Sequence, residues 1–422
     1  MESIIKKEIA KGMGLTLIKT EKFKSNLISI NIQRMLEKEE AAKNSLLPQV
    51  LLSGCERYPS MRELSDRLDD LYGASIMGDT SKRGEKQIIS FKILNTNDKY
   101  IDEKIFADII ELMNNIITKP LIVDGGFKKE YLDIEKENLK NKVLSIINDK
   151  KSYAHKRCIE IMCEDEKYSI PSSGNIDEIE SITTEDLYEH YKKIIRDSRI
   201  DIIVEGDFDC EEIENIIKNH FSIERGQIQE LTREDFSKNV SSVKKVDESM
   251  DITQGKLVMG YRANVDYKDA KKYYALVTGC SVLGGGAHSK LFNNVREKES
   301  LCYYIFATVD KYKSIMLISS GIEIENRDKT EKLINENLKS VMNGDITEEE
   351  LLNTKKSLIN GFKSSCDGIG GMSEFVFSQE LGNTDYKIEE IIEYVENVTI
   401  EDIVEAMRDI QEDTVYFLTN EK

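Results

Sequence analysis

The chain has 422 residues, of which 40% are hydrophobic and 32% are charged, so it is an ordinary globular protein with enough length for two or three domains. Its formal net charge of −19 argues against a general nucleic-acid binder and against attachment to anionic lipid. The seven cysteines form no C-x-x-C pair, which favours reduced thiols. The first residues contain no apolar signal segment, and no run of about 18 apolar residues occurs. We therefore expect a cytoplasmic protein.

The first half of the chain alternates between strand and helix patterns. Alternating apolar and polar residues predict strands within 14–35, a hairpin over 74–80 and 86–95, and a strand over 199–207. Apolar residues at helical spacing predict helices over 40–54, 60–71, 101–118, 127–146, 150–164 and 184–195. Pro48 lies inside the first of these helices, where it marks the first turn or a kink. Ser60 and Glu63 predict a capping box at the start of the second.

A polar, weakly patterned segment separates the two halves. We interpret 223–250 as a linker between an amino-terminal domain (1–222) and a carboxy-terminal domain (251–422). The second domain has strand patterns over 256–262, 302–309, 313–322 and 414–418. Its helix patterns cover 269–282, 328–342, 347–363, 371–382 and 399–410.

The second half repeats the pattern of the first. The segment that begins Ile182-Thr183-Thr184-Glu185-Asp186 is matched by Val398-Thr399-Ile400-Glu401-Asp402, and each is followed by a helix and a strand. The offset is 398 − 182 = 216 residues, close to half of the chain. Two further matching triplets, Glu130-Tyr131-Leu132 and Glu350-Leu351-Leu352, each open a long helix. The repeat predicts two copies of one α+β unit of about 200 residues.

The stretch 283–305 carries the clearest chemical pattern. It opens with Gly284, Gly285 and Gly286, continues with a short helical run that contains Arg296, and closes on a strand that contains Tyr303. A guanidinium is a permanently charged, forked donor and a phenol is a rigid donor and acceptor, so together they can hold a peptide carbonyl or a carboxylate. The alternative is structural: the glycines make a turn and Arg296 is a surface charge.

The pattern Leu-Gly-Gly-Gly-x-x-Ser-x-Leu-Phe-x-x-Val-Arg-Glu-x-x-x-Leu-x-Tyr at 283–303, carried by a chain of two α+β halves, closely resembles the insulinase/pitrilysin family of metallopeptidases, in the branch of the mitochondrial processing peptidase. The resemblance covers nearly the whole chain. It implies two homologous halves, each a mixed, mainly antiparallel sheet with helices packed on one face, that form half of a clamshell.

The resemblance also implies where a zinc site belongs. The family carries an inverted motif, His-x-x-Glu-His, whose two imidazoles bind Zn²⁺ and whose glutamate is the general base. Here Ser45 and Gln49 stand at the histidine positions and Pro48 stands at the glutamate position, so none of the three can do this work. A remnant persists on the later helix, where Glu137 matches the third ligand and Glu130 precedes it.

Other residues offer no replacement for the metal site. His155, His190 and His220 lie on separate helical segments without an i,i+4 partner, and Cys158 and Cys163 have the wrong spacing for zinc. We therefore expect that this chain binds no cofactor and that zinc is carried by a partner subunit.

What the resemblance leaves is the other half of the family's site. There an arginine and, seven residues later, a tyrosine hold the substrate or its oxyanion, and Arg296 and Tyr303 match them, with the glycines 284–286 beside them. Our first hypothesis is a non-catalytic, substrate-binding subunit of a heterodimeric zinc peptidase, whose partner carries His-x-x-Glu-His. The isolated chain would be inactive, and without that partner it would form a homodimer.

Two alternatives stay open. One is a scaffold or peptide-binding protein without peptidase activity that captures peptides at the edge of the 86–95 hairpin. The resemblance also implies a link to translation-factor modification, which these residues neither support nor refute. The other is an independent peptidase that uses Cys302 as nucleophile, for which the sequence supplies no positioned histidine.

Overall fold

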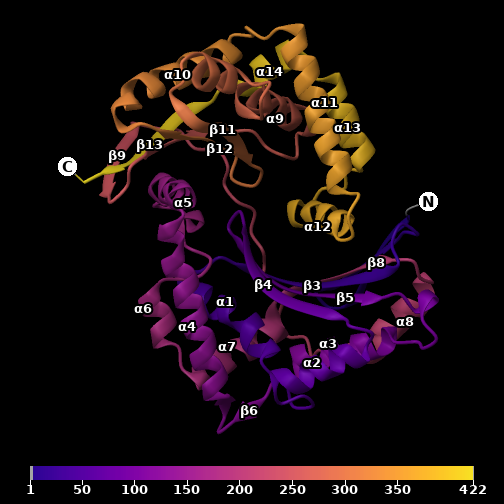
Figure 1. Ribbon diagram of the computed structural model, residues 1–422. Coiled ribbons are helices and arrows are strands. Elements are labelled where there is room, and N and C mark those ends of the chain that lie inside the picture. Colours follow the sequence, from indigo (N-terminus) through magenta and orange to yellow (C-terminus); the bar gives the residue numbers. More distant parts are fainter. Residues whose placement is uncertain (1–2, 422) are drawn as a thin grey trace. The chain divides into compact units, whose positions relative to one another are not determined.

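The computed structural model describes residues 3–421, which form two compact units, each built on one large sheet (Figure 1). Unit 1 contains the residues up to Leu144 together with 170–232 and 366–377. Unit 2 contains 145–169, 233–365 and the residues from Ser378 onward. The units therefore differ from a division at one linker, because each includes a segment from the other half of the sequence.

The sheet of unit 1 has six strands in the order β1-β2-β8-β3-β5-β4. Strands β2 and β8 run parallel, and every other neighbouring pair is antiparallel. The strands are β1 (Ser3–Ala10), β2 (Met13–Lys19), β3 (Ser25–Met35), β4 (Ser75–Arg83), β5 (Lys86–Thr96) and β8 (Arg199–Gly206). The predicted strands of the first half are confirmed, and β1 is an additional edge strand.

The sheet of unit 2 repeats this topology. Its order is β11-β12-β10-β13-β9, and only β13 and β9 run parallel. Read from β9, the strands correspond in sequence order and direction to β2, β8, β3, β5 and β4 of unit 1, which confirms the predicted duplication. The strands are β9 (Lys244–Met250), β10 (Gly255–Arg262), β11 (Cys302–Asp310), β12 (Ile315–Ile322) and β13 (Gln411–Asn420).

The repeat extends to individual caps. Thr183 caps α7 (Thr184–Asp197) by accepting a hydrogen bond from the backbone N–H of Asp186. Thr399 caps α14 (Ile400–Met407) in the same way with Asp402. Both helices then lead into the strand that lies between a parallel and an antiparallel neighbour, β8 and β13. The matched threonines therefore start equivalent helices in the two units.

Helices cover one face of the sheet of unit 1 (Figure 1). Their buried side chains meet Ile28, Ile30 and Ile32 of β3, whose alternation places all three on the same face. The helices are α1 (Lys38–Leu52), α2 (Met61–Asp70), α3 (Phe106–Thr118), α4 (Lys129–Ser145), α6 (Ile176–Ser181), α7 and α8 (Cys210–His220). Two short antiparallel strands, β6 (Ile122–Val123) and β7 (Gly126–Phe127), form a small hairpin between α3 and α4. The opposite face of β3 carries buried polar groups, among them Asn31 and Gln33.

The sheet of unit 2 is buried on both faces, so the residues of its central strands β10 and β12 are almost all buried. One face packs on α5 (Lys150–Met162), through Ala154, Cys158 and Met162. Helix α5 comes from the first half of the sequence, which is why unit 2 includes 145–169. The remaining helices are α9 (Ala270–Gly284), α10 (Arg327–Met342), α11 (Glu348–Ser365), α13 (Ile388–Asn397) and α14; α12 (Gly371–Gly382) begins in unit 1 and ends in unit 2.

Two sequence predictions need correction. The segment 223–250 is not a linker throughout, because Lys244–Met250 is the edge strand β9, whose alternately exposed charged residues hid it among polar sequence. Ser60 caps α2, but Glu63 accepts the hydroxyl proton of Ser60 instead of its backbone N–H, so the capping box is incomplete. Helices α6, α8 and α13, strand β1 and the short strands β6 and β7 were not predicted.

Candidate functional site

Arg296 lies on an unusual helical turn of unit 2. Residues Phe292–Lys298 form a π-helix, and buried Val295 anchors it while its carbonyl accepts a hydrogen bond from the N–H of Leu301. The Arg296 side chain is 42% exposed, its guanidinium carbon lies 4.7 Å from the centre of the Phe292 ring, and the nearest carboxylate is that of Glu297 at 3.7 Å. π-Helical turns are rare and often occur at functional sites. The turn presents a positive charge to solvent without a short ion pair.

Tyr303 lies at a β-bulge. Cys302 pairs with Ile322 and Tyr304 with Gly321, so Tyr303 is the extra residue of β11 between them. Ser300, just before the strand, has φ = 53°, which turns the chain sharply from the π-helix into β11. The Tyr303 side chain is 64% exposed, and its hydroxyl lies 3.2 Å from Oε1 of Glu323. Bulges re-aim side chains, and this one directs a tyrosine away from the sheet.

The three glycines of the motif differ in their surroundings. Gly284 is the last residue of α9, and a Cβ there would lie 2.6 Å from the backbone nitrogen of Ala307, so this glycine lets α9 pack closely on β11. Gly285 caps the helix, and Gly286 has open space around it. None of the three glycines has a positive φ, so a left-handed backbone does not explain them. Close packing on β11 explains Gly284.

Cys302 is buried, and burial raises the pKa of its thiol to about 11, although the nearby charge of Arg296 acts in the opposite direction. A thiol with this pKa is protonated at neutral pH and is a poor nucleophile. The burial of this thiol and its raised pKa therefore argue against a cysteine peptidase that uses Cys302 as nucleophile.

Ser45 and Gln49, which the resemblance assigns to the two histidine positions of the zinc motif, take part in internal hydrogen bonds of unit 1. The hydroxyl of Ser45 donates to the carbonyl of Ser172 at 2.7 Å, and the amide of Gln49 donates to the carbonyl of Gly78 at 2.7 Å. Both side chains thus bond to backbone carbonyls of unit 1, and the carbonyl of Ser172 also accepts a hydrogen bond from Gln87.

Pro48 is built into the middle of α1. A proline has no N–H, so the carbonyl of Asn44 lacks its usual helical partner, and the hydroxyl of Thr80 donates to that carbonyl at 3.2 Å. A Cβ at Gly78 would lie 2.7 Å from Cβ of Pro48, so glycine at this position lets β4 approach the proline. The helix and β4 are therefore adapted to proline at the position of the general base.

The remnant acidic residues lie on the exposed surface of α4. Glu137 has a 61% exposed side chain that pairs with Lys140 at 2.9 Å, and this hydrogen bond lowers the pKa of its carboxyl. Glu130 is 68% exposed and lies 3.4 Å from Lys128. Both carboxylates are paired with lysines of their own segment, as solvated helix residues commonly are.

A buried polar network that the sequence did not predict lies next to Ser45. The amide of Asn44 donates to Gln87 at 2.8 Å, and Gln87 donates to the carbonyls of Ala41 and Ser172. Nε2 of His190 lies 2.8 Å from Oδ1 of Asn44; because this amide oxygen can only accept, the imidazole donates. The network joins α1, β5, α7 and the loop at Ser172.

Comparison with known proteins places this chain in a family. It is 34% identical over 409 residues to the probable inactive metalloprotease YmfF of Bacillus subtilis (strain 168), covering 96% of each chain. The chain belongs to the M16 peptidase family, the insulinase/pitrilysin family. A family model described as the peptidase M16 inactive domain matches residues 181–358. The resemblance noted in the sequence is thereby confirmed.

Two solved structures have the same fold as this chain. A conserved protein from Enterococcus faecalis V583 superposes with a TM-score of 0.91 at 31% identity, covering 99% of both chains. A peptidase M16 inactive domain from Pseudomonas fluorescens superposes with a TM-score of 0.82 at 15% identity, covering 100% of this chain and 99% of the other, which shows a common fold.

The zinc ion of active M16 peptidases does not fit the residues present here. Serine, glutamine and proline supply no imidazole and no carboxylate, and their polar atoms are used in bonds to the backbone. Within residues 3–421, no group of three or more His, Cys, Asp or Glu side chains is placed to hold a metal ion. The chain is an inactive metalloprotease homologue that has lost the zinc motif.

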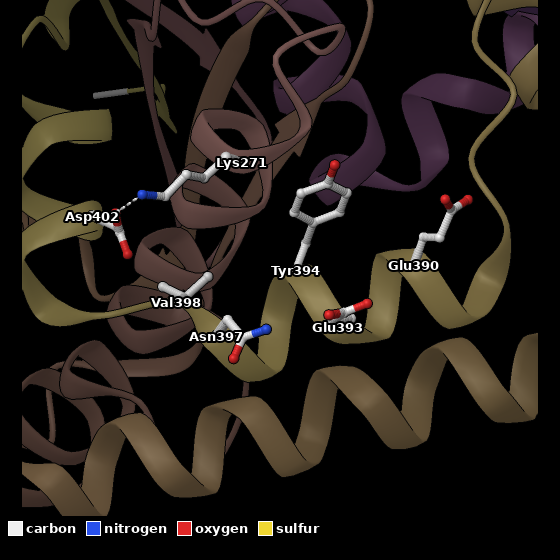
Figure 2. Close-up of a pocket in the computed structure, with 7 residues that line it drawn as sticks. All are labelled: Lys271, Glu390, Glu393, Tyr394, Asn397, Val398 and Asp402. Carbon is white, nitrogen blue, oxygen red and sulfur yellow. Dashed lines mark ion pairs between the residues drawn. The ribbon is translucent and has the colours of Figure 1, made fainter.

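A cavity of about 330 Å³ opens on the helical side of unit 2 (Figure 2). It is lined by Lys271, Glu390, Glu393, Tyr394, Asn397, Val398 and Asp402, and Lys271 pairs with Asp402 at 2.9 Å. Neither Arg296 nor Tyr303 lines it, so it is distinct from the Arg/Tyr motif.

Among the helices of the described chain, none has the length and apolar character of a membrane span.

Proposed function

We propose that this chain is the substrate-binding subunit of a heterodimeric zinc peptidase. Its partner would be an M16 homologue that carries His-x-x-Glu-His and holds the zinc, and this chain would supply Arg296 and Tyr303 to bind the peptide. The cytoplasmic location predicted from the cysteines belongs to this proposal.

The observation that carries the proposal is a contrast between two sets of residues. Arg296 and Tyr303 project into solvent from specialised backbone, a π-helix and a β-bulge, and neither is used to stabilise the fold through buried contacts. The polar atoms of Ser45 and Gln49 instead bond to backbone carbonyls of unit 1, although the Gln49 side chain is exposed. The chain thus keeps a binding half and has converted the metal half into structure.

An arginine and a tyrosine are suited to this role because they hold a peptide without needing a metal of their own. Donors aimed at the charge that develops on a carbonyl oxygen each contribute about 2.7–4 kcal/mol to catalysis. That contribution requires a metal-activated water, which the proposal assigns to the partner.

The test is reconstitution. The purified chain alone should contain no stoichiometric zinc by elemental analysis and should cleave no peptide, and addition of the zinc-bearing homologue should produce peptidase activity. In that pair, Arg296→Ala or Tyr303→Phe should lower kcat/KM by about a hundred- to a thousandfold. Lys298→Ala is the matched control, since Lys298 is an exposed cation on the same π-helix.

Each outcome is decisive. Activity of the pair that ignores both substitutions would rule out the assigned role of the two residues. A stable complex with a homologue that never cleaves peptides, whatever the substrate, would favour the scaffold alternative.

A further inference from the structure

Two lysines and two aromatic rings form a cluster at the edge strand β11 of unit 2. Tyr304 and Phe306 lie on the same face of β11, and their ring centres are 5.9 Å apart. The ammonium of Lys151, in the first turn of α5, lies 4.8 Å from the centre of the Tyr304 ring and 4.4 Å from that of Phe306. The ammonium of Lys256, on β10, lies 5.9 Å from the centre of the Tyr304 ring. We call these four residues the lysine–aromatic cluster.

The sheet is adapted to this cluster at Gly321 of β12. Tyr304 and Lys256 both pair with Gly321, so the three residues form one row across the sheet and share a face. A Cβ at Gly321 would lie 2.5 Å from the Tyr304 ring, so glycine at this position lets the ring lie over β12. The packing of the sheet thus holds the ring next to the ammonium of Lys256.

Neither lysine of the cluster has an ion pair within residues 3–421. The ammonium of Lys151 lies over the two rings, and that of Lys256 donates to the neutral amide oxygen of Gln254 at 2.7 Å. Burial lowers the pKa of Lys256, although the charges of Asp149 and Glu323 act to raise it. The protein therefore compensates the charge of Lys256 only in part.

The two carboxylates near the cluster are used elsewhere. Asp149 caps α5 and accepts hydrogen bonds from backbone N–H groups at the start of that helix. Glu323 lies 3.2 Å from the hydroxyl of Tyr303, the residue that directly precedes Tyr304 in β11. Glu323 thus lies beside Tyr303 and its charge also acts on Lys256, which relates the cluster to the Arg/Tyr motif.

The ligand that fits these groups carries a single carboxylate. An ammonium forms its strongest hydrogen bonds with ionised oxygens, and the chain's net charge of −19 disfavours a polyanion such as nucleic acid. We propose that the lysine–aromatic cluster is a subsite for an acidic side chain of the bound peptide, with Lys151 and Lys256 as donors to its carboxylate. The proposal rests on the proposed function in taking the ligand to be the peptide, and it adds a substrate class, acidic peptides.

The first test is the sequence preference of the reconstituted pair. A random library of peptides with amidated carboxyl termini excludes the terminal carboxylate as the ligand, and mass spectrometry identifies the members that are cleaved. At one position relative to the cleaved bond, Asp and Glu should be enriched about tenfold over Asn and Gln, the scale of a hydrogen bond to a charged group. Cleavage without such an enrichment would overturn the proposal.

Substitutions in the cluster assign the preference to the lysines. Lys151→Met and Lys256→Met keep an unbranched apolar stem beside the rings and remove the charge, so each should abolish most of the enrichment, whereas Lys151→Arg should preserve it. Lys156→Met is the matched control, because Lys156 lies on the same helix and pairs with Glu160 at 3.5 Å. If the lysines serve only to cover the rings, both methionine variants will retain the enrichment, which would refute the subsite.

A binding measurement on the isolated chain separates the subsite from the proposed function. By fluorescence anisotropy, a labelled amidated library that contains Asp and Glu should bind about tenfold more tightly than one in which Asn and Gln replace them. This difference should vanish in Lys151→Met/Lys256→Met and shrink as salt is added. Equal binding of the two libraries, or binding of neither, would overturn the subsite. If the acidic library binds as expected but the pair never cleaves peptides, the proposed function fails while the subsite stands.

Discussion

Glu205 and Ser373, 168 residues apart, are joined by two hydrogen bonds inside unit 1. Oε2 of Glu205 accepts from the Ser373 backbone N–H at 3.1 Å and from its hydroxyl at 2.7 Å, and the N–H of Gly370 donates to the same oxygen. Glu205 is 1% exposed on β8, and the three donors belong to the first turn of α12. A buried carboxylate at a helix amino terminus thus ties the segment 366–377 to the sheet of unit 1.

Glu205→Gln should release this segment. The substitution removes the charge that strengthens the three bonds, so we expect the free energy of unfolding to fall by about 1–3 kcal/mol. Amide hydrogen exchange over residues 370–377 should accelerate, which mass spectrometry measures. Glu374→Gln is the control, because that neighbour forms an exposed ion pair with Arg83 and should change stability by less than about 1 kcal/mol. Equal effects of the two substitutions would contradict the anchoring role.

Glu166 should be the corresponding anchor of 145–169 in unit 2. Its carboxylate is 5% exposed and lies 2.8 Å from Arg262 and 2.6 Å from Lys313, both almost fully buried. Because removal of one partner leaves buried cations uncompensated, Glu166→Gln should lower the free energy of unfolding at pH 7 by about 3–5 kcal/mol in urea titrations. Glu164→Gln, which breaks only the exposed pair with Lys244, should have little effect.

The same carboxylate predicts acid sensitivity. Burial acts to raise the pKa of Glu166, but the hydrogen bonds and charges of Lys313 and Arg262 outweigh burial and lower that pKa to about 2. A carboxyl whose pKa is lower in the folded than in the unfolded chain stabilises the fold above its ordinary pKa of 4.5, and this stabilisation is lost as the pH falls toward 2. The stability difference between the unsubstituted chain and Glu166→Gln should therefore shrink between pH 4.5 and 2; a difference that is constant over that range would refute this.

His190 should make stability fall in a milder range of pH. Burial lowers the pKa of this 8% exposed imidazole to about 4, although the charge of Glu40 acts to raise it. The unfolded chain then binds a proton at higher pH than the folded chain, so the free energy of unfolding should fall as the pH drops from 6.5 to about 4, by up to about 3 kcal/mol. His190→Gln should remove this slope in urea titrations, whereas substitution of the exposed His220 should preserve it.

Gly284→Ala should destabilise unit 2, although the residue belongs to the glycine motif for which we propose a substrate-binding role. Its Cβ would meet the backbone of Ala307, and overpacking at such a contact costs about 1–3 kcal/mol. Gly286→Ala, whose nearest neighbour would be His288 at 3.5 Å, should leave the melting temperature unchanged. A loss of peptide binding in Gly286→Ala at unchanged stability would assign that glycine to the substrate.

Most elements could be predicted because their patterns are local. Alternation along β3 and helical spacing in α7 depend on which residues face one core, and a single sequence contains that information. The strand β9 could not be predicted in this way, because its partners lie on β13, more than 160 residues away, and its own residues are mostly polar. The π-helix over Phe292–Lys298 escaped prediction for a related reason, since no spacing of apolar residues specifies its i→i+5 backbone hydrogen bonds.

By itself, the sequence indicated two copies of one unit and, through its resemblance to the M16 family, predicted that Ser45, Pro48 and Gln49 stand where zinc-site residues are expected, because both are statements about residue identity and order. Only the tertiary structure decided what the remaining residues do. It placed α5 on the sheet of unit 2, turned Ser45 and Gln49 into structural donors, and put Glu323 beside Tyr303. The physical reason is that the direction of a hydrogen bond and the fit of a buried face depend on groups far apart in the chain, which come together only on folding.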